Sequence, residues 1–342
     1  MKVLVAPLNW GIGHASRSSV LIEQHLQKGH QVLIASSGTA LMFLKRRLPN
    51  LQFFELPDYQ ITYHKSRPVW LSVLFGLKTL SSAIKKEQKV IQKLQNIHKF
   101  DLIISDNRYG VYHNSVKSIF VCHQLVPKAP FGHRLFKTFI EAIHRNYIKG
   151  FDELYIPDYQ SPETKLSGDL NQLQLHWKQN QNYIQPLSHL KLKNQAGEAN
   201  RILVLLSGVE PKRSQLEHQL MHLFSSGFEA YSLCFVGGSL EKTTLETHSK
   251  SIEYHSFLDK QDLENQINKA SVIICRSGYS TLMDLHELNR KHIILIPTKG
   301  QTEQDYLAAY LENKFSHFSA LESSELKKMT SISLKEKLKS VI

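Results

Sequence analysis

Short apolar runs alternate with stretches in which apolar residues recur every three or four positions, and the first forty residues show this alternation clearly. The pattern predicts a strand, a glycine-rich turn, a helix that Gly29 ends, and a second strand. Such a unit is typical of a parallel sheet covered by helices. The expected elements are a strand over Lys2–Pro7, a turn over Asn9–His14, a helix from about Ser16 to Lys28 and a strand over Gln31–Ser36.

The alternation continues on both sides of a hydrophilic stretch between residues 186 and 200. We place the domain boundary there, which gives an N-terminal domain over residues 1–190 and a C-terminal domain over residues 191–342. The first should add strands over Leu51–Leu56, Leu102–Ser105, Ser118–Cys122 and Glu153–Ile156, and helices over Val69–Lys99 and Phe131–Lys149. The second should contain strands over Arg201–Leu206, Ala230–Val236, Ser251–Tyr254, Val272–Cys275 and His292–Ile296, helices over Pro211–Phe224, Lys260–Lys269, Ser280–Leu288 and Gln304–Asn313, and a weak final helix. The predicted fold class is α/β, with two Rossmann-like, doubly wound domains facing each other across a cleft.

Length and composition agree with two domains. A chain of 342 residues exceeds what one hydrophobic core usually organises, and its 42% apolar and 21% charged residues are those of an ordinary globular protein. No apolar run reaches the 18 residues that a membrane-spanning helix needs, and the first run stops at Asn9, short of a signal-peptide core. The three cysteines are widely spaced without a CxxC pair, which favours reduced thiols and no structural metal. These features predict a cytoplasmic protein.

The net charge of +12 is concentrated in the first half of the chain. Residues 1–186 hold 23 Lys and Arg against 12 Asp and Glu, whereas residues 187–342 hold 19 against 18. This asymmetry indicates an anionic partner, for which nucleic acid, a phospholipid surface and a pyrophosphate-bearing substrate are the candidates. No helix-turn-helix, zinc or RNA-binding signature accompanies the charge, so nucleic acid is not expected.

The turn that contains Gly11, Gly13 and His14 lies where the first strand hands over to a helix. Glycines let the backbone approach a ligand, and a helix N-terminus offers unpaired N–H groups and a positive dipole end to a phosphate. The dinucleotide fingerprint is incomplete because Ser16 stands where the third glycine belongs. A turn without a ligand is the competing interpretation. His14 adds a group that could take a proton from a substrate hydroxyl, although most isolated histidines are structural.

Two further strand-to-helix turns occur in the second half. Each follows a buried-looking strand of an open parallel sheet, and the loops at the carboxyl ends of such strands form the ligand crevice. Their hydroxyls, amides and carboxylates suit phosphate, ribose and sugar hydroxyls, although a capped helix and surface polar residues would look the same. The first turn runs from Cys275 to Asp284, and the second runs from Pro297 to Tyr306.

These residues resemble the family 28 glycosyltransferases of the GT-B fold, typified by the transferase that adds N-acetylglucosamine to the lipid-linked peptidoglycan precursor. The resemblance is strongest from Tyr254 to Tyr310. It rests on three ordered elements: Phe257-Leu258, then Cys275-Arg276-Ser277-Gly278 with Thr281 and Asp284, and Ile296-Pro297 followed by Glu303-Gln304-Asp305-Tyr306. The N-terminal turn matches less fully, and the loop after Ser207-Gly208 departs from the glycine-rich phosphate loop of the family.

The resemblance implies a glycosyltransferase that uses a nucleotide-sugar, UDP-linked, donor without a metal ion or other cofactor. Leu258 would contact the base through its backbone, Asp284 the ribose, Ser280 and Thr281 the diphosphate, and Gln304 and Asp305 the donor sugar. Backbone N–H groups and a helix dipole, with Lys212 or Arg213, would stabilise the leaving diphosphate. The remaining donor-site candidates are Ser207, Gly208, Ser277, Gly278, Glu303 and Arg276, for which a structural role is equally open.

The family mechanism also implies inversion, in which a base of the N-terminal domain takes the proton of the acceptor hydroxyl. His14 is the first candidate for this base, and Asp106, at the end of a buried-looking strand, is the second. An ion pair between Asp106 and Arg108 would remove the second candidate. Gly11, Gly13, Asn107, Arg108 and His123 are the candidate acceptor-site residues. The acceptor is unidentified, with a lipid-linked or cell-envelope glycan as one class.

Residues 69–93 combine an apolar stretch, Val69 to Leu77, with the following lysines 85, 86, 89 and 93. Such a stretch can lie in an anionic bilayer interface, which would make the protein peripheral on the inner face of the cell membrane. A core helix followed by a solvated one explains the same pattern. Two functional alternatives also stay open: a UDP-sugar epimerase or hydrolase of the same fold, and a non-catalytic sugar-nucleotide-binding protein.

Overall fold

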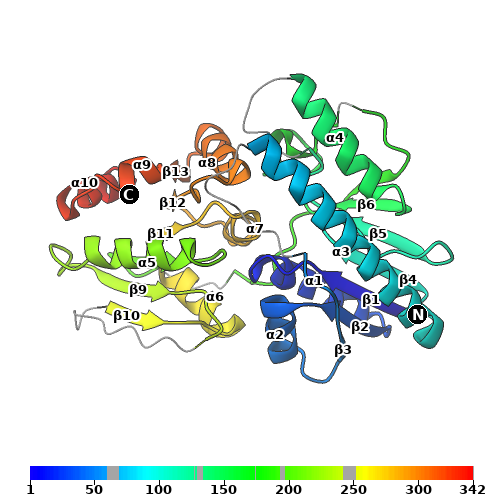
Figure 1. Cartoon of the computed structure of the whole chain (residues 1–342). Helices are drawn as coiled ribbons and strands as arrows, with labels where there is room; N and C mark the ends of the chain where they lie inside the picture. Colours follow the sequence, from blue (N-terminus) through cyan, green and yellow to red (C-terminus); the bar gives the residue numbers. More distant parts are fainter. Residues whose placement is uncertain are drawn as a thin grey trace.

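The computed structural model describes residues 1–59, 69–126, 128, 134–173, 175–192, 197–241 and 252–341, with side chains omitted for residues 69–78 and 134–137. Two parallel sheets, each flanked by helices, lie side by side in this part of the chain (Figure 1). The strand order in the N-terminal sheet is β3-β2-β1-β4-β5-β6-β7, and in the C-terminal sheet it is β10-β9-β8-β11-β12-β13. The doubly wound architecture expected from the sequence is confirmed.

The N-terminal domain begins with the predicted strand–helix–strand unit. Mostly apolar residues, buried on both faces, form the strands over Lys2–Pro7, Gln31–Ser36 and Leu102–Asp106, as is typical of parallel strands between two helical layers. The elements are β1 (Lys2–Pro7), α1 (Gly13–Gln27), β2 (Gln31–Ser36), α2 (Gly38–Arg47), β3 (Gln52–Glu55), α3 (Val69–His98), β4 (Leu102–Asp106), β5 (Lys117–Val121), α4 (Arg134–Ile148), β6 (Glu153–Ile156), the 3-10 turn η1 (Gly168–Asn171) and β7 (Asn180–Tyr183).

The C-terminal domain repeats this plan. Its elements are β8 (Arg201–Leu205), α5 (Lys212–Leu223), β9 (Ser232–Val236), β10 (Ile252–His255), α6 (Lys260–Lys269), β11 (Val272–Cys275), α7 (Tyr279–Glu287), β12 (Ile293–Leu295), α8 (Thr302–Lys314), β13 (Phe318–Ala320), α9 (Ser323–Leu326) and α10 (Ser331–Val341). The final helix, α10, buries Leu334 and Leu338 against the same core as α5. The expectation of a closing helix is therefore confirmed.

Each sheet reverses its strand order at one point, and both reversals face the region between the domains. In the first sheet β1 lies beside β4, so that Pro7 pairs with Asp106. In the second sheet β8 lies beside β11, so that Leu205 pairs with Cys275. Ligands of open α/β sheets bind outside the carboxyl ends of the strands at such reversals. The fold therefore places the turns after β1, β4, β8 and β11 at the expected position for a site.

The two domains share apolar packing along α1 and α7, which lie side by side at the centre of the molecule (Figure 1). One core cluster contains Ile22 of α1, Leu282 and Met283 of α7, and Leu187 of the segment that connects the domains. Burial of such side chains is worth about 1.5–3 kcal/mol each, which stabilises the closed arrangement. Among the described residues, no helix is both long enough and apolar enough to cross a membrane.

Most predicted elements occur within three residues of their expected bounds, and the differences have local causes. Helix α1 begins at Gly13 rather than Ser16, so His14 lies inside its first turn. Helix α2 and the short strands β7 and β13 were missed because the sequences are short or, in β7, polar. The side chains of residues 69–78, on which membrane insertion depends, lie outside the described set.

Candidate active site at the domain interface

The turn between β1 and α1 presents His14 to the interface. Gly11 has a φ of +68°, a conformation that favours glycine, and this bend brings the chain from β1 into α1. His14 follows in the first turn of α1, whose first turn carries no acidic residue. The positive end of the helix dipole faces the second domain, and no carboxylate in the first turn of α1 neutralises it.

His14 forms a pair with Asp106, the last residue of β4. The Nδ1 atom of His14 lies 2.8 Å from Oδ1 of Asp106, and the Asp106 side chain is fully buried. The same carboxylate accepts hydrogen bonds from Arg17 Nε and from Ser18 Oγ, each at 2.8 Å, and it forms a short ion pair with Arg17 Nη2. Asp106 is therefore tied to Arg17, and the alternative pairing with Arg108 is wrong.

These contacts set the protonation of the pair. Burial by itself raises the pKa of the Asp106 carboxyl, but the Arg17 guanidinium and His14 hold that pKa well below its usual range. Burial lowers the pKa of His14, and Arg17 lowers it further, while Asp106 acts in the opposite direction. Asp106 is therefore a carboxylate, a poor base whose lone pairs are occupied, whereas His14 is a neutral imidazole at pH 7.

His123, which follows β5, connects this pair to the second domain. Its Nδ1 atom lies 3.0 Å from Arg17 Nη1, and its Nε2 atom lies 2.7 Å from Oε1 of Glu303 in α8. The ring stacks on Tyr279 of α7 with centroids 4.0 Å apart and an interplanar angle of 4°. The predicted acceptor-site residue His123 and the predicted donor-site residue Glu303 thus contact each other across the interface.

The glycine-rich turns of the two domains also meet directly. Ser280 Oγ donates to the carbonyl oxygen of Gly13 at 3.0 Å. A Cβ atom at Gly11 would lie 3.8 Å from the Gly208 backbone. On the C-terminal side, a Cβ atom at Gly278 would lie 4.0 Å from both Ser207 Oγ and Gln304 Nε2. Candidates from four separate turns are therefore gathered at one place.

The turn before α8 is braced by its own side chains. Ser277 Oγ donates to the Gln304 carbonyl oxygen at 2.9 Å, and the Gln304 side chain accepts from the Thr298 backbone N–H at 2.9 Å. Gln304 also donates to Gln301 at 2.6 Å. In this arrangement Gln304 shapes the loop, while the neighbouring Asp305 is exposed.

Three arginines have structural contacts that leave them out of the site. Arg108 is fully buried and pairs with Glu87. Arg213 is held by Glu210, Glu217 and the Gly237 carbonyl oxygen, which corrects its expected role at the diphosphate. Arg276 donates to the carbonyl oxygens of Ile296, Pro297 and Lys212 at 3.3, 3.1 and 3.0 Å, and burial lowers its pKa to about 10. The structural interpretation of Arg276 is the one these contacts favour.

Asp284 lies on α7, one turn beyond Ser280, and accepts a hydrogen bond from Ser188 Oγ at 2.6 Å. Burial raises the pKa of its carboxyl to about 7, with the Ser188 hydroxyl acting in the opposite direction. Leu258 and Thr281 of the C-terminal domain are partly exposed, and Asn107 is partly exposed after β4 with a φ of +62°.

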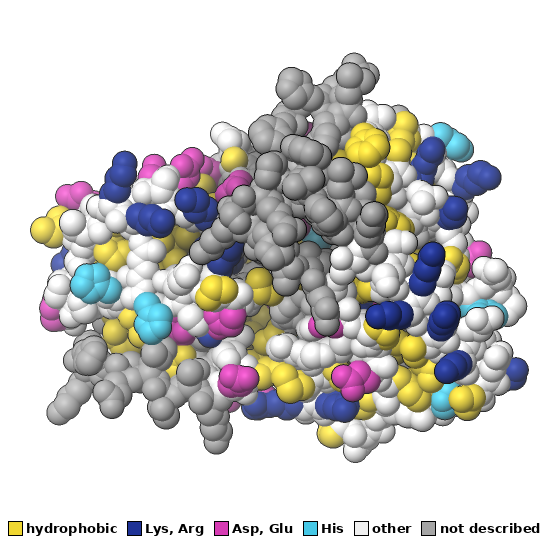
Figure 2. All heavy atoms as spheres, viewed as in Figure 1, with side chains coloured by type: hydrophobic (Ala, Val, Ile, Leu, Met, Phe, Trp, Pro, Cys, Tyr) yellow, Lys and Arg dark blue, Asp and Glu magenta, His cyan; other side chains and the backbone are white. Residues whose placement is uncertain are grey.

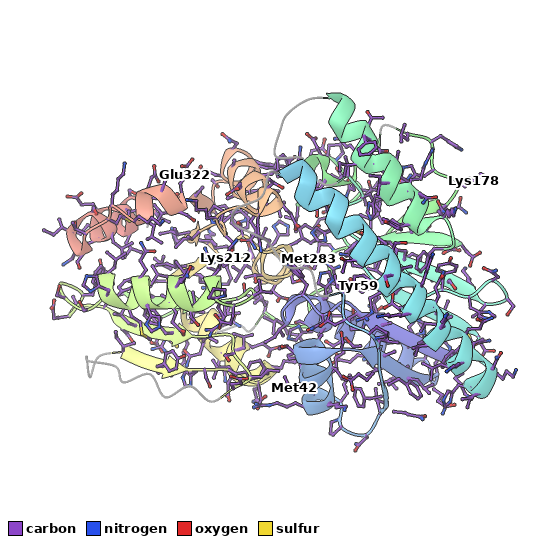
Figure 3. All side chains as sticks on the ribbon, viewed as in Figure 1. Met42, Tyr59, Lys178, Lys212, Met283 and Glu322 are labelled. Carbon is purple, nitrogen blue, oxygen red and sulfur yellow. The ribbon has the colours of Figure 1, made fainter. Side chains whose placement is uncertain are left out.

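The segment that connects the domains touches both central helices, a feature with no sequence signal. Ser16 Oγ of α1 lies 3.0 Å from His189 Nδ1, while Ser188 reaches Asp284 of α7. The Leu187 N–H donates to the sulfur of Met283 at 3.3 Å, and Figure 3 shows Met283 between the two domains. The segment thus fixes α1 and α7 from one side.

Sequence reasoning missed two residues at the centre of the site. Arg17 lies in the helix predicted from about Ser16 and was given no role, although it lies three positions after His14 and therefore on the same helix face. Tyr279 follows Gly278, and its hydroxyl donates to the Pro157 carbonyl oxygen of the other domain at 2.9 Å. The spacing offered a signal for Arg17, whereas the partner of Tyr279 is set by tertiary structure.

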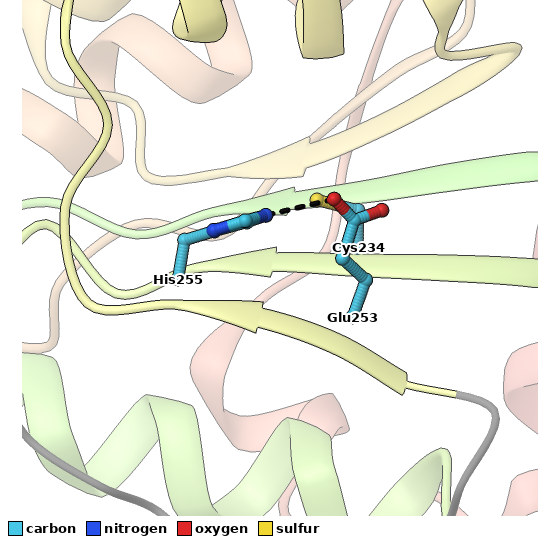
Figure 4. A group of neighbouring side chains, drawn as sticks. All are labelled: Cys234, Glu253 and His255. Carbon is cyan, nitrogen blue, oxygen red and sulfur yellow. Dashed lines mark hydrogen bonds and ion pairs between the residues drawn. The ribbon is translucent and has the colours of Figure 1, made fainter.

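In the part of the chain that the structure describes, one group of metal-ligand side chains converges, on β9 and β10. Ligand atoms of Cys234, Glu253 and His255 lie within 4.8 Å of one another (Figure 4). Arg201 Nη2 contacts the Glu253 carboxylate at 2.6 Å and supplies the positive charge that a metal would bring. Burial raises the pKa of the Cys234 thiol to about 12, which disfavours a thiolate ligand. These contacts satisfy the group as an ion-pair cluster.

The chain is similar in sequence to known glycosyltransferases. Residues 204–341 match the family model of the glycosyltransferase family 28 C-terminal domain, and residues 1–120 match that of glycosyl transferase family 1. An uncharacterized glycosyltransferase of Methanosarcina mazei is 23% identical over 336 residues, which cover 92% of this chain and 84% of that protein.

Solved structures share the two-domain arrangement. The calicheamicin glycosyltransferase CalG4 has a TM-score of 0.68 at 11% identity, with 99% of this chain and 89% of that chain covered. The spinosyn rhamnosyltransferase SpnG, complexed with thymidine diphosphate, has a TM-score of 0.62 at 12% identity, with 99% and 92% covered. The resemblance to family 28 and the expected two-domain fold are confirmed.

Proposed function

Because residues 204–341 match the family 28 C-terminal domain, the relatives over nearly the whole chain are glycosyltransferases and the fold is that of GT-B glycosyltransferases, we propose that the protein transfers a sugar from a UDP-linked donor to an acceptor hydroxyl held by its N-terminal domain. The observation that supports this most strongly is the His14–Asp106 pair, whose Nδ1 and Oδ1 atoms lie 2.8 Å apart next to the contact between Gly13 and Ser280 of the C-terminal domain. The pair supplies a base, and the opposite turns supply a cradle for a diphosphate.

His14 acts as the base through Nε2. When Nδ1–H donates to the Asp106 carboxylate, the ring is oriented and its Nε2 lone pair is available for a proton. The acceptor oxygen loses its proton to Nε2 as it forms a bond to the anomeric carbon. The bond between that carbon and the diphosphate oxygen breaks, and the nucleoside diphosphate leaves with the electron pair. Attack opposite the leaving group inverts the anomeric centre.

The C-terminal domain stabilises the leaving group without a metal ion. The N-terminus of α7 has no acidic residue in its first turn and presents backbone N–H groups together with Ser280 and Thr281. Asp284 accepts hydrogen bonds from the ribose diol, and Leu258 contacts the base through its backbone. The binding of thymidine diphosphate by SpnG supports this class of donor, with uracil as the proposed base here.

The acceptor belongs to the lipid-linked or cell-envelope glycans, and the protein works peripherally at the inner face of the cell membrane. The support is the basic surface of α3, where Lys85, Lys86, Lys89 and Lys93 are all exposed. Figure 2 shows Lys and Arg side chains gathered over this part of the N-terminal domain. Sedimentation with anionic liposomes at low salt tests this part, and protein that stays in the supernatant would contradict it.

A thermal-shift screen with nucleoside diphosphates and their sugars tests the donor site. A ligand at about 100 times its dissociation constant stabilises the folded protein by roughly 2.7 kcal/mol, so UDP or a UDP-sugar should raise the melting temperature of the wild type. Asp284→Ala should abolish the shift, whereas the exposed Asp262→Ala on α6 should keep it. A wild type that responds to no nucleotide would refute the proposal.

Product analysis with the stabilising donor separates the competing activities. A transferase gives a nucleoside diphosphate and a glycosylated acceptor with the opposite anomeric configuration. Release of free sugar without an acceptor would indicate a hydrolase, an isomerised donor would indicate an epimerase, and binding without any turnover would indicate a sensor. Unchanged turnover after treatment with EDTA is expected, because no step passes through a metal.

A further inference from the structure

Arg17 contacts three titratable side chains at the interface. It is 2% exposed and donates through Nε to Asp106 Oδ2 at 2.8 Å and through Nη1 to His123 Nδ1 at 3.0 Å, while its Nη2 atom lies 3.0 Å from His14 Nδ1. Its second contact to Asp106 completes a two-point ion pair. A guanidinium presents these donors in a fixed planar fork, so one side chain sets the relative positions of three others.

The contact with Arg17 fixes the tautomer of His123. A guanidinium can only donate, so His123 Nδ1 must accept and the ring hydrogen must lie on Nε2. That N–H donates to Glu303 Oε1 at 2.7 Å, and Tyr279 holds the ring flat by stacking on it. His123 therefore accepts a hydrogen bond from Arg17 of the N-terminal domain and donates one to Glu303 of the C-terminal domain.

Glu303 belongs to the same loop and helix start as the proposed donor contacts. It lies in the first turn of α8 beside Gln304, whose carbonyl oxygen accepts from Ser277 and whose side chain accepts from the Thr298 N–H. A shift of this loop would therefore displace Glu303, and through His123 it would change the anchoring of Arg17.

The position of Arg17 matters because His14 Nδ1 has two competing partners. It lies 2.8 Å from Asp106 Oδ1 and 3.0 Å from Arg17 Nη2, and it can donate to the first or accept from the second, but not both. Only the first tautomer leaves Nε2 free to take a proton. The guanidinium that neutralises Asp106 thus also decides which form of His14 is populated.

We propose that Arg17 is the positioning residue of the His14 base, and that His123 and Glu303 hold it in place only when the two domains are closed. The inference rests on the proposed function, because it assigns Arg17 a role in that reaction. Closure around the donor then completes the base, so that proton removal is confined to the closed complex.

Kinetics of Arg17→Lys, Glu303→Ala and the double variant test the link. An ammonium cannot contact Asp106, His14 and His123 at once, so Arg17→Lys should lower kcat by about 10²-fold while the dissociation constant for UDP changes by less than about twofold. Glu303→Ala should lower kcat by about tenfold. If the chain acts as one unit, the double variant should lose no more than Arg17→Lys alone, whereas additive losses would refute the link.

Glu312→Ala is the matched control, because it removes a carboxylate of the same helix whose hydrogen bonds among the described residues, from Ser319 and Ala320, stay within its own domain. It should leave kcat unchanged. Should Arg17→Lys fail to fold, Glu303→Ala carries the test, since the Glu303 side chain is 29% exposed and tolerates truncation.

Nitrogen NMR of histidine-labelled full-length protein gives a readout independent of activity. The wild type should show His123 with its proton on Nε2, and Glu303→Ala should shift the His14 resonances although the two side chains belong to different domains. A proton on Nδ1 of His123, or His14 resonances that ignore Glu303, would overturn the inference. A wild type that binds and turns over no nucleotide-sugar would instead refute the proposed function, whatever the tautomers are.

Discussion

The turn before α1 and the turn before α7 have the same architecture and opposite chemistry. Each follows a central parallel strand, contains glycine, and opens a helix with no acidic residue in its first turn. Around the first turn, Asp106, Arg17, His14 and His123 form a continuous titratable network. Around the second, hydroxyls and backbone groups face the interface. The same fold element thus carries a network of titratable side chains in one domain and mainly hydroxyl and backbone groups in the other.

The arginine associated with each turn shows the difference most directly. Arg17 contacts a carboxylate and two imidazoles, whereas Arg276 contacts three backbone carbonyl oxygens. The first changes the electrostatics of ionisable groups, and the second fixes the position of loops. Burial of an arginine is therefore no guide to its role until its partners are known.

Removing the proposed base should lower kcat more than any other change to the two turns. His14→Ala should lower kcat by about 10²–10⁴-fold, the usual contribution of a general base. Asp106→Asn should lower it by a similar factor, because a carboxamide can donate to His14 and favour the wrong tautomer. Steady-state kinetics with a nucleotide-sugar measure both.

Nucleotide binding by the C-terminal domain should not change in these two variants. Binding of UDP, measured by calorimetry, should stay within about twofold of wild type in both variants, since His14 and Asp106 lie in the other domain. A loss of nucleotide affinity that matches the loss of kcat would show that the two turns are not chemically distinct.

Arg276→Met should have the next largest effect, on stability instead of turnover. It would remove the Arg276 donor from three carbonyl oxygens, of which the Pro297 oxygen keeps its hydrogen bond from Ser323, and a buried acceptor left unsatisfied costs about 1–3 kcal/mol. We expect the free energy of unfolding of the C-terminal domain to fall by about 2–4 kcal/mol, with kcat of the folded enzyme retained. Chemical denaturation measures the first quantity, and a kcat loss above about tenfold would reassign Arg276 to the donor site.

Gly13→Ala should weaken the contact between the two turns. The new Cβ atom would lie 2.9 Å from Ser280 Oγ, and the overlap should cost about 1–3 kcal/mol in the closed form. Gly13 lies in a helix without a positive φ, so alanine is tolerated by the free domain. The expected result is a drop in kcat/KM of about 5- to 100-fold.

Ser280→Ala provides the matched partner, because it removes the crowding hydroxyl. Combined with Gly13→Ala, it should recover part of the lost kcat/KM, even though Ser280→Ala alone loses the hydrogen bond to Gly13. Purely additive losses in the double variant would mean that the turns do not touch during turnover.

The sequence predicted the fold well because both sheets are built from local signals. Buried apolar runs such as Val272–Cys275 and the helix-ending Gly29 need no tertiary information to be recognised. The polar edge strand Asn180–Tyr183 was not predicted, because its pairing with β6 defines it and its composition does not. Local pattern therefore found the centre of each sheet better than its edge.

The site was predicted by position more than by partnership. His14, Asp106 and His123 were identified as polar groups at strand ends, and the structure brings all three together. Their connection through Arg17 was missed, and Arg108 was expected where it does not reach, because neither spacing nor composition tells which of two arginines a buried carboxylate will bind. The Arg17–Asp106 pairing joins a helix and a strand end that are 89 residues apart in the chain, so only the tertiary structure determines it.

The smallest expected effect is a pH dependence that belongs to the donor turn alone. Burial raises the pKa of Asp284 to about 7, and the ionised carboxylate is the better acceptor for a ribose diol. The carboxylate is protonated below that value, so UDP affinity should fall as the pH is lowered, by about twofold between pH 8 and pH 7 and more steeply below. The pKa of His14 is lowered from 6.5, so kcat should stay flat over that interval, because the base remains neutral.

Asp284→Asn separates this titration from that of the nucleotide itself. The variant should bind UDP more weakly, with an affinity that no longer varies between pH 8 and pH 7 beyond the change shown by an Asp262→Asn control. Calorimetry at constant ionic strength measures both. If kcat and UDP affinity titrate together in the wild type, one group governs both turns and the division of chemistry between the domains is wrong. If only the affinity titrates, protons act separately at the two turns, as their different surroundings require.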